Sequence, residues 1–254
     1  MDDPIDRRKK MIAGAVLAIA AVAAVLYGQF RSRRVSDSVL TASHDTAAKT
    51  TSPYQYQDVS ALRRQAEQNP ESADAASAYG IALDQQGYHQ QAVEQLEKAL
   101  RLAPSDANLR FSYGHALETS GRTDDAIAAY ELTGRQDSQM FKAHLAAARL
   151  LHRRGRVDEA IADYRLAIRA NPSDASAHNY LGAALASLGE TDQAIAEYEA
   201  AFQLDPKNGQ IAYTIGTACR RKGDTQGALY WFTKGCEASG HAGACSAARR
   251  MKGG

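Results

Sequence analysis

The chain has 254 residues and a formal net charge of +1, with 44% hydrophobic and 7% aromatic residues. This near-neutral balance lacks the basic excess that nucleic-acid binding requires, so we expect no nucleic-acid partner. Sparse aromatic residues and abundant alanine are typical of short helices that pack closely.

Residues 11–30 form an uncharged run after a short N-terminal tail, residues 1–10. A helix of about 20 apolar residues crosses the roughly 30 Å hydrocarbon core of a bilayer, so we predict a transmembrane anchor that contacts lipid. A short tail with four basic residues, Arg7 to Lys10, is hard to translocate. We therefore expect a bacterial inner-membrane protein whose remaining chain is periplasmic. A cleaved signal peptide is the alternative, because Ala18-Ile19-Ala20 fits a cleavage site.

Residues 31–57 are rich in serine, threonine and aspartate and poor in apolar residues. Such a composition cannot bury enough apolar surface to fold, which predicts a flexible linker.

The next segment repeats itself every 34 residues. Glycines recur at this interval, each five residues before an alanine: Gly87, Gly121, Gly155, Gly189 and Gly223. Units of this length cannot bury their own apolar face and must stack on their neighbours. Five frames result, 73–106, 107–140, 141–174, 175–208 and 209–242. In each frame the glycine is expected in the turn between two helices. Small residues recur at frame position 8 of the first helix, and bulky residues recur at position 24 of the second.

The repeat pattern resembles that of a known family. The fourth frame carries Leu181-Gly182, Gly189, Ala194, Tyr198, Ala201 and Pro206. With these residues the chain resembles the tetratricopeptide repeat family over about residues 58–242. The resemblance implies an all-α fold, a right-handed α-solenoid of helix-turn-helix repeats. Residues 58–72 are then an N-terminal half-repeat helix, and residues 243–254 a C-terminal cap and tail.

Two of the three cysteines, Cys236 and Cys245, lie nine residues apart where the last repeat meets the cap. Their surroundings loosely resemble Sel1-like repeats, in which comparable pairs form disulfides. The resemblance implies a Cys236–Cys245 disulfide and an oxidising compartment, with two free thiols as the alternative. Cys219 occupies a core position and is expected to be a buried thiol.

No motif for catalysis, phosphate binding or metal binding occurs in the sequence. His144 and His178 share frame position 4, which is a helix-packing position. We therefore predict that the protein is not an enzyme and uses no metal or cofactor.

The resemblance places a binding groove on the first helix of each repeat, at frame positions 2, 5, 9, 12 and 13. Here these positions form an acidic first repeat followed by a basic interior. The candidate partner-binding residues are Asn108, Phe111, His115, Lys142, Arg149, His152, Arg153, Asn179, Tyr213, Arg220 and Arg221. Such a groove suits an extended or helical protein segment with acidic groups. The alternative is that the arginines serve only solubility.

Two functions fit these features. The first is a membrane-tethered adaptor or assembly factor that binds a partner segment in its groove. The second is a constitutive accessory subunit of a larger membrane complex, held partly through its transmembrane helix. In that case the small-residue stripe Ala20, Ala24 and Gly28 would be a helix contact.

Overall fold

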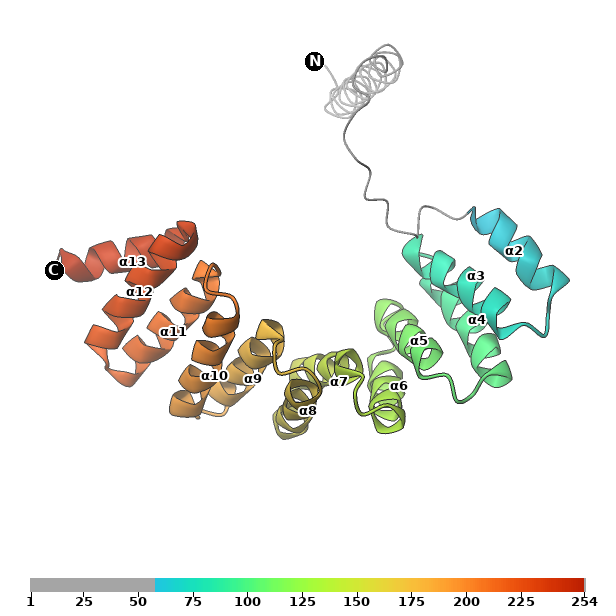
Figure 1. The fold of residues 1–254 in the computed structure, drawn as a ribbon, viewed down its shortest axis with the longest axis horizontal. Helices are drawn as coiled ribbons and strands as arrows, with labels where there is room; N and C mark the ends of the chain where they lie inside the picture. Colours follow the sequence, from blue (N-terminus) through green and yellow to red (C-terminus); the bar gives the residue numbers. More distant parts are fainter. Residues whose placement is uncertain (1–57, 254) are drawn as a thin grey trace, which may run out of the picture. The chain divides into compact units, whose positions relative to one another are not determined.

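The computed structural model describes residues 58–253. The predicted tail, anchor and linker, residues 1–57, lie outside this range. The described residues form helices and no strand. None of these helices is both long and apolar enough to span a membrane. In chain order the helices are α2 (Val59–Gln68), α3 (Ala73–Gln85), α4 (His89–Leu102), α5 (Ala107–Thr119), α6 (Thr123–Gln136), α7 (Phe141–Arg153), α8 (Val157–Ala170), α9 (Ala175–Ser187), α10 (Thr191–Leu204), α11 (Gly209–Lys222), α12 (Thr225–Ser239) and α13 (Ala242–Lys252) (Figure 1).

The helices pair in order into five repeats, α3 with α4 through α11 with α12, and each pair packs on the next. Helix α2 covers the first repeat, and α13 packs on α11 and α12 as a cap. Tyr56–Gly254 is one compact unit, separate from Met1–Gln55. Because this unit contains its own continuous core, we expect it to fold by itself.

Polar caps and glycine turns set the helix ends. The side chains of Ser72 and Asp106, for example, accept hydrogen bonds from the backbone N–H groups of Ala75 and Leu109. The five repeat glycines have φ values from 78° at Gly155 to 89° at Gly223, a left-handed conformation that favours glycine. The 34-residue glycine period therefore marks the turn inside each repeat.

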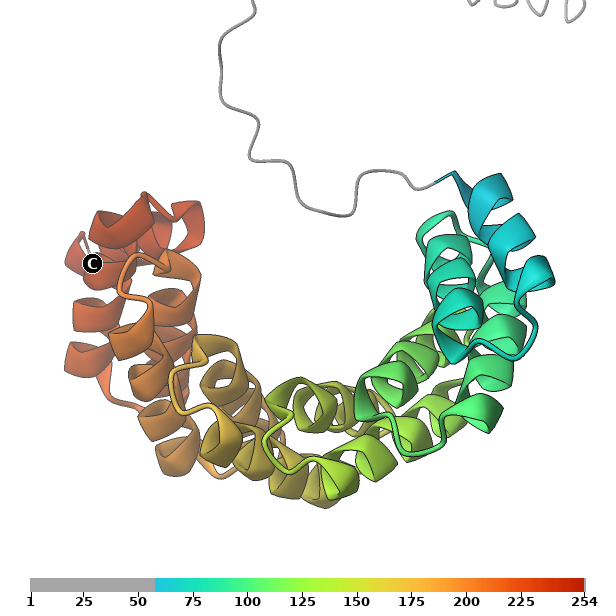
Figure 2. The same cartoon turned by 45° about the vertical axis from the view of Figure 1, so that its right-hand side comes forward.

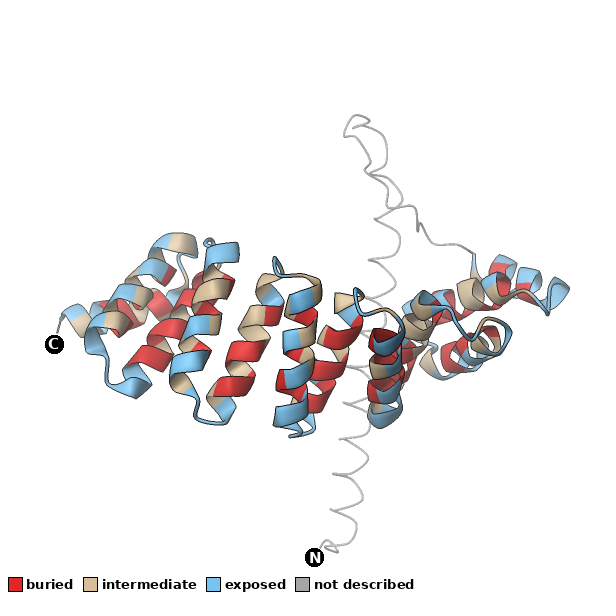
Figure 3. Ribbon diagram, turned by 60° about the horizontal axis from the view of Figure 1, so that its bottom comes forward, coloured by how far each residue is buried: buried red, intermediate tan, exposed pale blue. Residues whose placement is uncertain are grey.

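The core consists of small and bulky side chains that meet inside each repeat. Figure 3 shows the buried residues in red along the helices. A Cβ atom on Gly114 would lie 2.8 Å from the ring of Tyr130, and one on Gly216 would lie 2.7 Å from the ring of Phe232. Glycine at position 8 thus makes room for the bulky residue at position 24. Tyr130 and Phe232 are fully buried as a result.

Two irregular repeat ends have packing explanations. A Cβ on Gly134 would lie 2.4 Å from the ring of His144, so glycine there accommodates a buried histidine from the next repeat. A Cβ on Gly235 would lie 2.8 Å from the carbonyl oxygen of Gly209 and 3.0 Å from Cβ of Ala244. Gly235 therefore lets α11, α12 and α13 approach closely.

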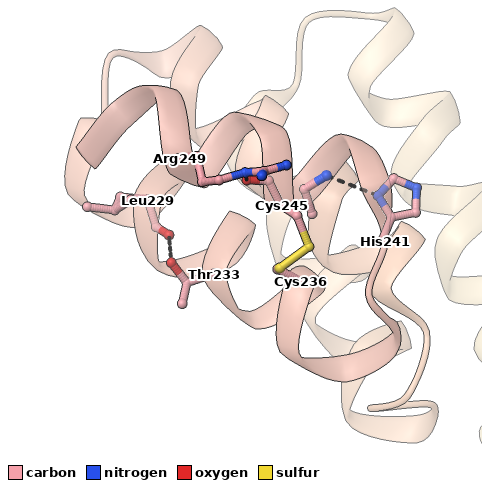
Figure 4. The surroundings of a disulfide bond; sticks show 7 residues. Leu229, Thr233, Cys236, His241, Cys245 and Arg249 are labelled. Carbon is pink, nitrogen blue, oxygen red and sulfur yellow. Dashed lines mark hydrogen bonds between the residues drawn. A yellow bond between two sulfur atoms is a disulfide. The ribbon is translucent and has the colours of Figure 1, made fainter. Parts of the chain in front are cut away.

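A disulfide joins Cys236 on α12 to Cys245 on α13, with 4.6 Å between the Cα atoms (Figure 4). Gly240, with φ at 63°, ends α12 and starts the turn into the cap. Cys219 is a free, buried thiol, and burial raises its pKa. The cap is thus fixed both by packing and by a covalent bond.

The repeats follow an arc in residues 58–253 (Figure 2). First helices of neighbouring repeats also contact each other, as α3 does α5 and α7 does α9. Helices on the inside of an arc lie closer together than those outside it. The first helices therefore form the concave face.

Candidate protein-binding groove

The predicted groove residues all lie on first helices, and most of them are accessible. Asn108, His115, Lys142, Arg149, Arg153, Arg220 and Arg221 are exposed, while Phe111, His152, Asn179 and Tyr213 are half-buried. Their neighbours differ along the array, and these differences decide which side chains are free to bind a partner.

At the first junction between repeats, Asp84 on α3 is surrounded by donors. Its carboxylate accepts hydrogen bonds from Nδ1 of His89 at 2.7 Å, Nδ1 of His115 at 2.6 Å and Oγ1 of Thr119 at 2.7 Å. The Asp84 side chain is only 10% exposed. Burial raises its pKa, but the hydrogen bonds from His89, Thr119 and His115 outweigh burial and hold the pKa below the usual value. His115, predicted as a free groove residue, is therefore already engaged.

The second junction repeats this arrangement with different side chains. Nη2 of Arg153 on α7 lies 3.2 Å from Oε1 of Glu118 on α5. Glu118 also accepts a hydrogen bond from the Tyr130 hydroxyl at 3.3 Å. Asp84 and Glu118 both occupy frame position 12, and their partners Thr119 and Arg153 both occupy position 13 of the next repeat. We call this register, from position 12 to position 13 of the next repeat, the inter-repeat ladder.

The ladder is open between the fourth and fifth repeats. There, position 12 is Ala186 and position 13 is Arg221, so the arginine has no acidic residue opposite it. Burial raises the pKa of Tyr198, and the charge of Arg221 opposes this rise. Beside Arg221, the guanidinium of Arg220 lies 5.8 Å from the ring centroid of Phe232. The fifth repeat thus presents two adjacent arginines.

An aromatic group supports the basic residues of the third repeat. The guanidinium of Arg149 lies 5.5 Å from the ring centroid of Tyr180, which stacks on Tyr164 at 6.0 Å. His152 meets Tyr164 edge-on at 6.5 Å. Burial raises the pKa of Tyr164 to about 12, so this phenol stays neutral. Tyr180 is therefore a groove residue that sequence reasoning missed.

The sequence contains a feature that distinguishes Tyr180 from the equivalent residues of the other repeats. Tyr180 occupies frame position 6, where the other repeats have small residues: Ala78, Ser112, Ala146 and Thr214. An aromatic residue at a position of small residues indicates a local function.

The first two repeats enclose an apolar hollow of about 160 Å³. Its lining residues are Ile81, Asp84, Gln85, Leu96, Phe111, Ser112 and His115. Ile81 is 37% exposed, and the Phe111 ring lies 5.3 Å from that of Tyr130. This part of the groove therefore offers apolar surface beside an Asp84 carboxylate that is already hydrogen-bonded.

The free charge in the interior of the groove is basic. Within residues 58–253, Lys142, Arg149, Arg220 and Arg221 form no ion pair. Asp84 and Glu118, by contrast, are already hydrogen-bonded to neighbouring repeats. Two carboxylates of the predicted acidic entrance thus hold the repeats together, while Asp74 at the start of the first repeat stays exposed. The basic interior stays available.

The remaining histidines have structural roles. His144 is 6% exposed and lies 3.4 Å from Oδ1 of Asp163, and His178 lies 2.7 Å from Oε2 of Glu197. In the described part of the chain, no three metal-ligating side chains gather in one place.

The sequence was compared with known proteins. A family model of the tetratricopeptide repeat matches residues 59–107, 80–141, 111–175, 145–209 and 181–242. Together these matches cover most of the chain, and the chain belongs to the tetratricopeptide repeat family. No curated protein matches the sequence.

Many solved structures share the fold. A crystal structure of MamA has a TM-score of 0.63 and 24% identity, and the match covers 66% of this chain and 92% of MamA. YrrB, described as a tetratricopeptide repeat protein with an unusual peptide-binding site, has a TM-score of 0.63 and 21% identity, over 75% of this chain and 99% of YrrB. MamA from Desulfovibrio magneticus RS-1 has a TM-score of 0.60 and 22% identity, over 65% and 94%. At these identities the similarity shows the fold.

Proposed function

We propose that the protein is a membrane-tethered adaptor that binds an acidic segment of a partner protein in its concave groove. The family supplies interaction scaffolds, and the unusual peptide-binding site of YrrB supports the choice of a peptide-like ligand. Fold alone does not name a partner, so the argument depends on the side chains of the groove.

The observation that carries the proposal is the open ladder at Arg221. Where the first two repeats place Asp84 and Glu118, the fourth repeat has Ala186, and Arg221 beside Arg220 forms no ion pair within residues 58–253. Clustered like charges repel each other, and an acidic ligand relieves this repulsion and is steered inward. We infer that a carboxylate of the partner protein occupies the space beside the short side chain of Ala186 and pairs with Arg221.

Arg149 provides a second contact for the same ligand. Its stacking on Tyr180 fixes the guanidinium without neutralising it, and arginine and tyrosine are frequent binding hot spots. Tyr213 adds apolar surface between these basic sites and is held by its own contacts with Phe232 and His241.

Membrane tethering completes the proposal. It depends on residues 11–30, which could cross a bilayer, and places the repeats on the periplasmic side of a bacterial inner membrane. The Cys236–Cys245 disulfide supports an oxidising compartment. The accessory-subunit alternative depends only on the stripe Ala20, Ala24 and Gly28, whereas the adaptor is also supported by the basic groove, so we propose the adaptor.

The test places an acidic side chain at position 12 opposite Arg221 and leaves every arginine unchanged. We expect Ala186→Glu to pair with Arg221, as Glu118 pairs with Arg153, and to weaken capture of the partner about five- to tenfold, which corresponds to roughly 1 kcal/mol. Residues 56–254 carrying either alanine or glutamate are immobilised, and the proteins retained from solubilised native membranes are quantified by mass spectrometry.

Ala186→Gln is the matched control, because glutamine has the size of glutamate and no charge. It should retain the partner as the wild type does. Charge reversal at Arg149 should also reduce capture, whereas Arg169→Glu on the outer helix α8 should not. Equal capture by the Ala186→Glu and Ala186→Gln variants would show that Arg221 does not bind the partner.

A further inference from the structure

The C-terminal end of the array carries an exposed aromatic and basic surface that the groove does not use. We define the C-terminal patch as Tyr230, Trp231, Lys234, Arg249 and Lys252, on α12 and α13, which lie at one end of the row of helices in Figure 1. Three residues of the patch, Tyr230, Lys234 and Lys252, line a hollow of about 440 Å³. The lining residues of this hollow are Gln226, Leu229, Tyr230, Thr233, Lys234, Glu237 and Lys252.

The repeat pattern does not account for the aromatic residues of the patch, because the other repeats have none at the same positions. At frame position 22, where the fifth repeat has Tyr230, the other repeats have Glu94, Ala128, Ala162 and Ala196. At position 23, where it has Trp231, they have Gln95, Ala129, Asp163 and Glu197. Tyr230 is 55% exposed, more than any other large hydrophobic residue in the described part of the chain.

The two aromatic rings are held in place by their neighbours. Trp231 packs edge-on against Phe202 of α10 with 5.3 Å between centroids, and Tyr230 packs edge-on against Trp231 at the same distance. This arrangement presents the apolar body of Tyr230 to solvent on a rigid support. An aromatic side chain that is both exposed and held in place is suited to insertion into an apolar or interfacial environment.

Basic side chains surround these rings. Nζ of Lys234 lies 5.8 Å from the ring centroid of Tyr230, and Lys252 lines the same hollow. Arg249, one turn before Lys252, donates a hydrogen bond from Nε to the carbonyl oxygen of Cys245 on the same helix (Figure 4). The helix dipole accounts for basic residues in the last turn of α13, but not for Lys234 or for the exposed tyrosine.

We propose that the C-terminal patch binds the surface of an anionic lipid bilayer. Tyrosine and tryptophan favour the headgroup level, where one end of the ring is apolar and the other is hydrated. Lysine and arginine side chains beside them attract anionic headgroups. The hollow is lined by two basic residues, Lys234 and Lys252, and by one acidic residue, Glu237. With Arg249 the basic residues outnumber the acidic one, so the charge is complementary to an anionic membrane. The proposal does not depend on the groove or on residues 1–57.

Trp231 is the sequence's single tryptophan, so its fluorescence reports on this patch alone. Residues 56–254 are mixed with vesicles of phosphatidylcholine, or with vesicles in which about one third of the lipid is phosphatidylglycerol. We expect a blue shift and co-sedimentation with the anionic vesicles only. Lys234→Glu with Lys252→Glu should lower the vesicle partition coefficient at least about tenfold, and Tyr230→Ser should lower it about threefold.

Lys98→Glu with Arg169→Glu is the matched control. It reverses two charges on outer helices, and Lys98 occupies the same frame position as Lys234. This control should bind vesicles as the wild type does, and circular dichroism should show equal helicity in all variants. The proposal is wrong if anionic vesicles leave the emission unchanged, if soluble glycerol phosphate gives the same shift, or if the control loses as much binding as the patch variant. It is also wrong if the patch retains only proteins and no lipid.

Discussion

Asp84 shows how one side chain can both join two repeats and limit the groove. It accepts hydrogen bonds from His89 within its own repeat and from His115 and Thr119 in the next. Its lowered pKa means that the ionised form stabilises the folded state. The carboxylate is therefore part of the scaffold, although its position in the sequence suggested a role in binding.

This role predicts a pH-dependent effect of Asp84→Asn. Because the folded pKa lies below the ordinary value of 3.8, the stabilisation is present above that value and is lost as the pH falls through the folded pKa. We expect the variant to lower the free energy of unfolding by about 1 to 2 kcal/mol at neutral pH, and the difference from wild type to shrink below pH 3.8. Urea unfolding at several pH values measures this difference.

Glu94→Gln is a suitable control for Asp84→Asn, since Glu94 is exposed on α4. It should change stability by less than about 0.5 kcal/mol. A difference between wild type and Asp84→Asn that stays constant from neutral pH to about pH 3 would contradict the role of the ionised carboxylate.

At the level of single residues, the sequence could predict packing better than pairing. The glycine at position 8 and the bulky residue at position 24 can be predicted from the 34-residue period, because the two helices pack in the same way in each repeat. The pairing of Arg153 with Glu118, and the stacking of Arg149 on Tyr180, depend on the reach of particular side chains across a junction. The pairing of Arg153 with Glu118 can be predicted from the sequence only once it is known that position 12 of one repeat lies opposite position 13 of the next.

At the level of helices, the sequence marks starts and turns clearly. The first helices begin at Ala73, Ala107, Phe141, Ala175 and Gly209, each the first residue of a 34-residue frame. Periodicity could not give the reason for the irregular repeat ends. Gly134 is explained by His144 of the next repeat, and Gly235 by Ala244 of the cap. A single frame does not contain these neighbours.

The cap helix α13 is the element most dependent on a covalent bond. Its buried residues, Ala244, Ala247 and Ala248, are small and bury little apolar area. The Cys236–Cys245 disulfide compensates by closing a short loop at the end of the stack, and we expect it to contribute about 2 to 3 kcal/mol. Replacing both cysteines with serine should therefore lower the melting temperature and speed amide exchange in α13.

Reductant provides the control for the disulfide. It should destabilise the wild type to the same extent as the double substitution and should leave the double variant unchanged. If all three cysteines of the native protein react with an alkylating agent without reductant, the bond is absent and the prediction fails.

At the level of the whole repeat unit, charge divides the concave face into two functions. The early repeats use their carboxylates to hold neighbours, through Asp84 and Glu118, and offer an apolar hollow. Within residues 58–253, the later repeats leave Arg149, Arg220 and Arg221 without acidic partners. The same first helices thus provide both cohesion and a basic binding surface, and the outer face at α12 and α13 is separate from both.

The central claim is that a partner's acidic segment lies in the concave groove. The most direct measurement is photo-crosslinking in native membranes, with p-benzoylphenylalanine at Tyr213 in the full-length chain and mass spectrometry of the products. Ala162 is the control position, because it is exposed on the outer helix α8. We predict crosslinks from position 213 to a segment rich in aspartate and glutamate, and none to that segment from position 162. Crosslinks to the partner from position 162 alone, or from position 213 to a segment without acidic residues, would contradict the account.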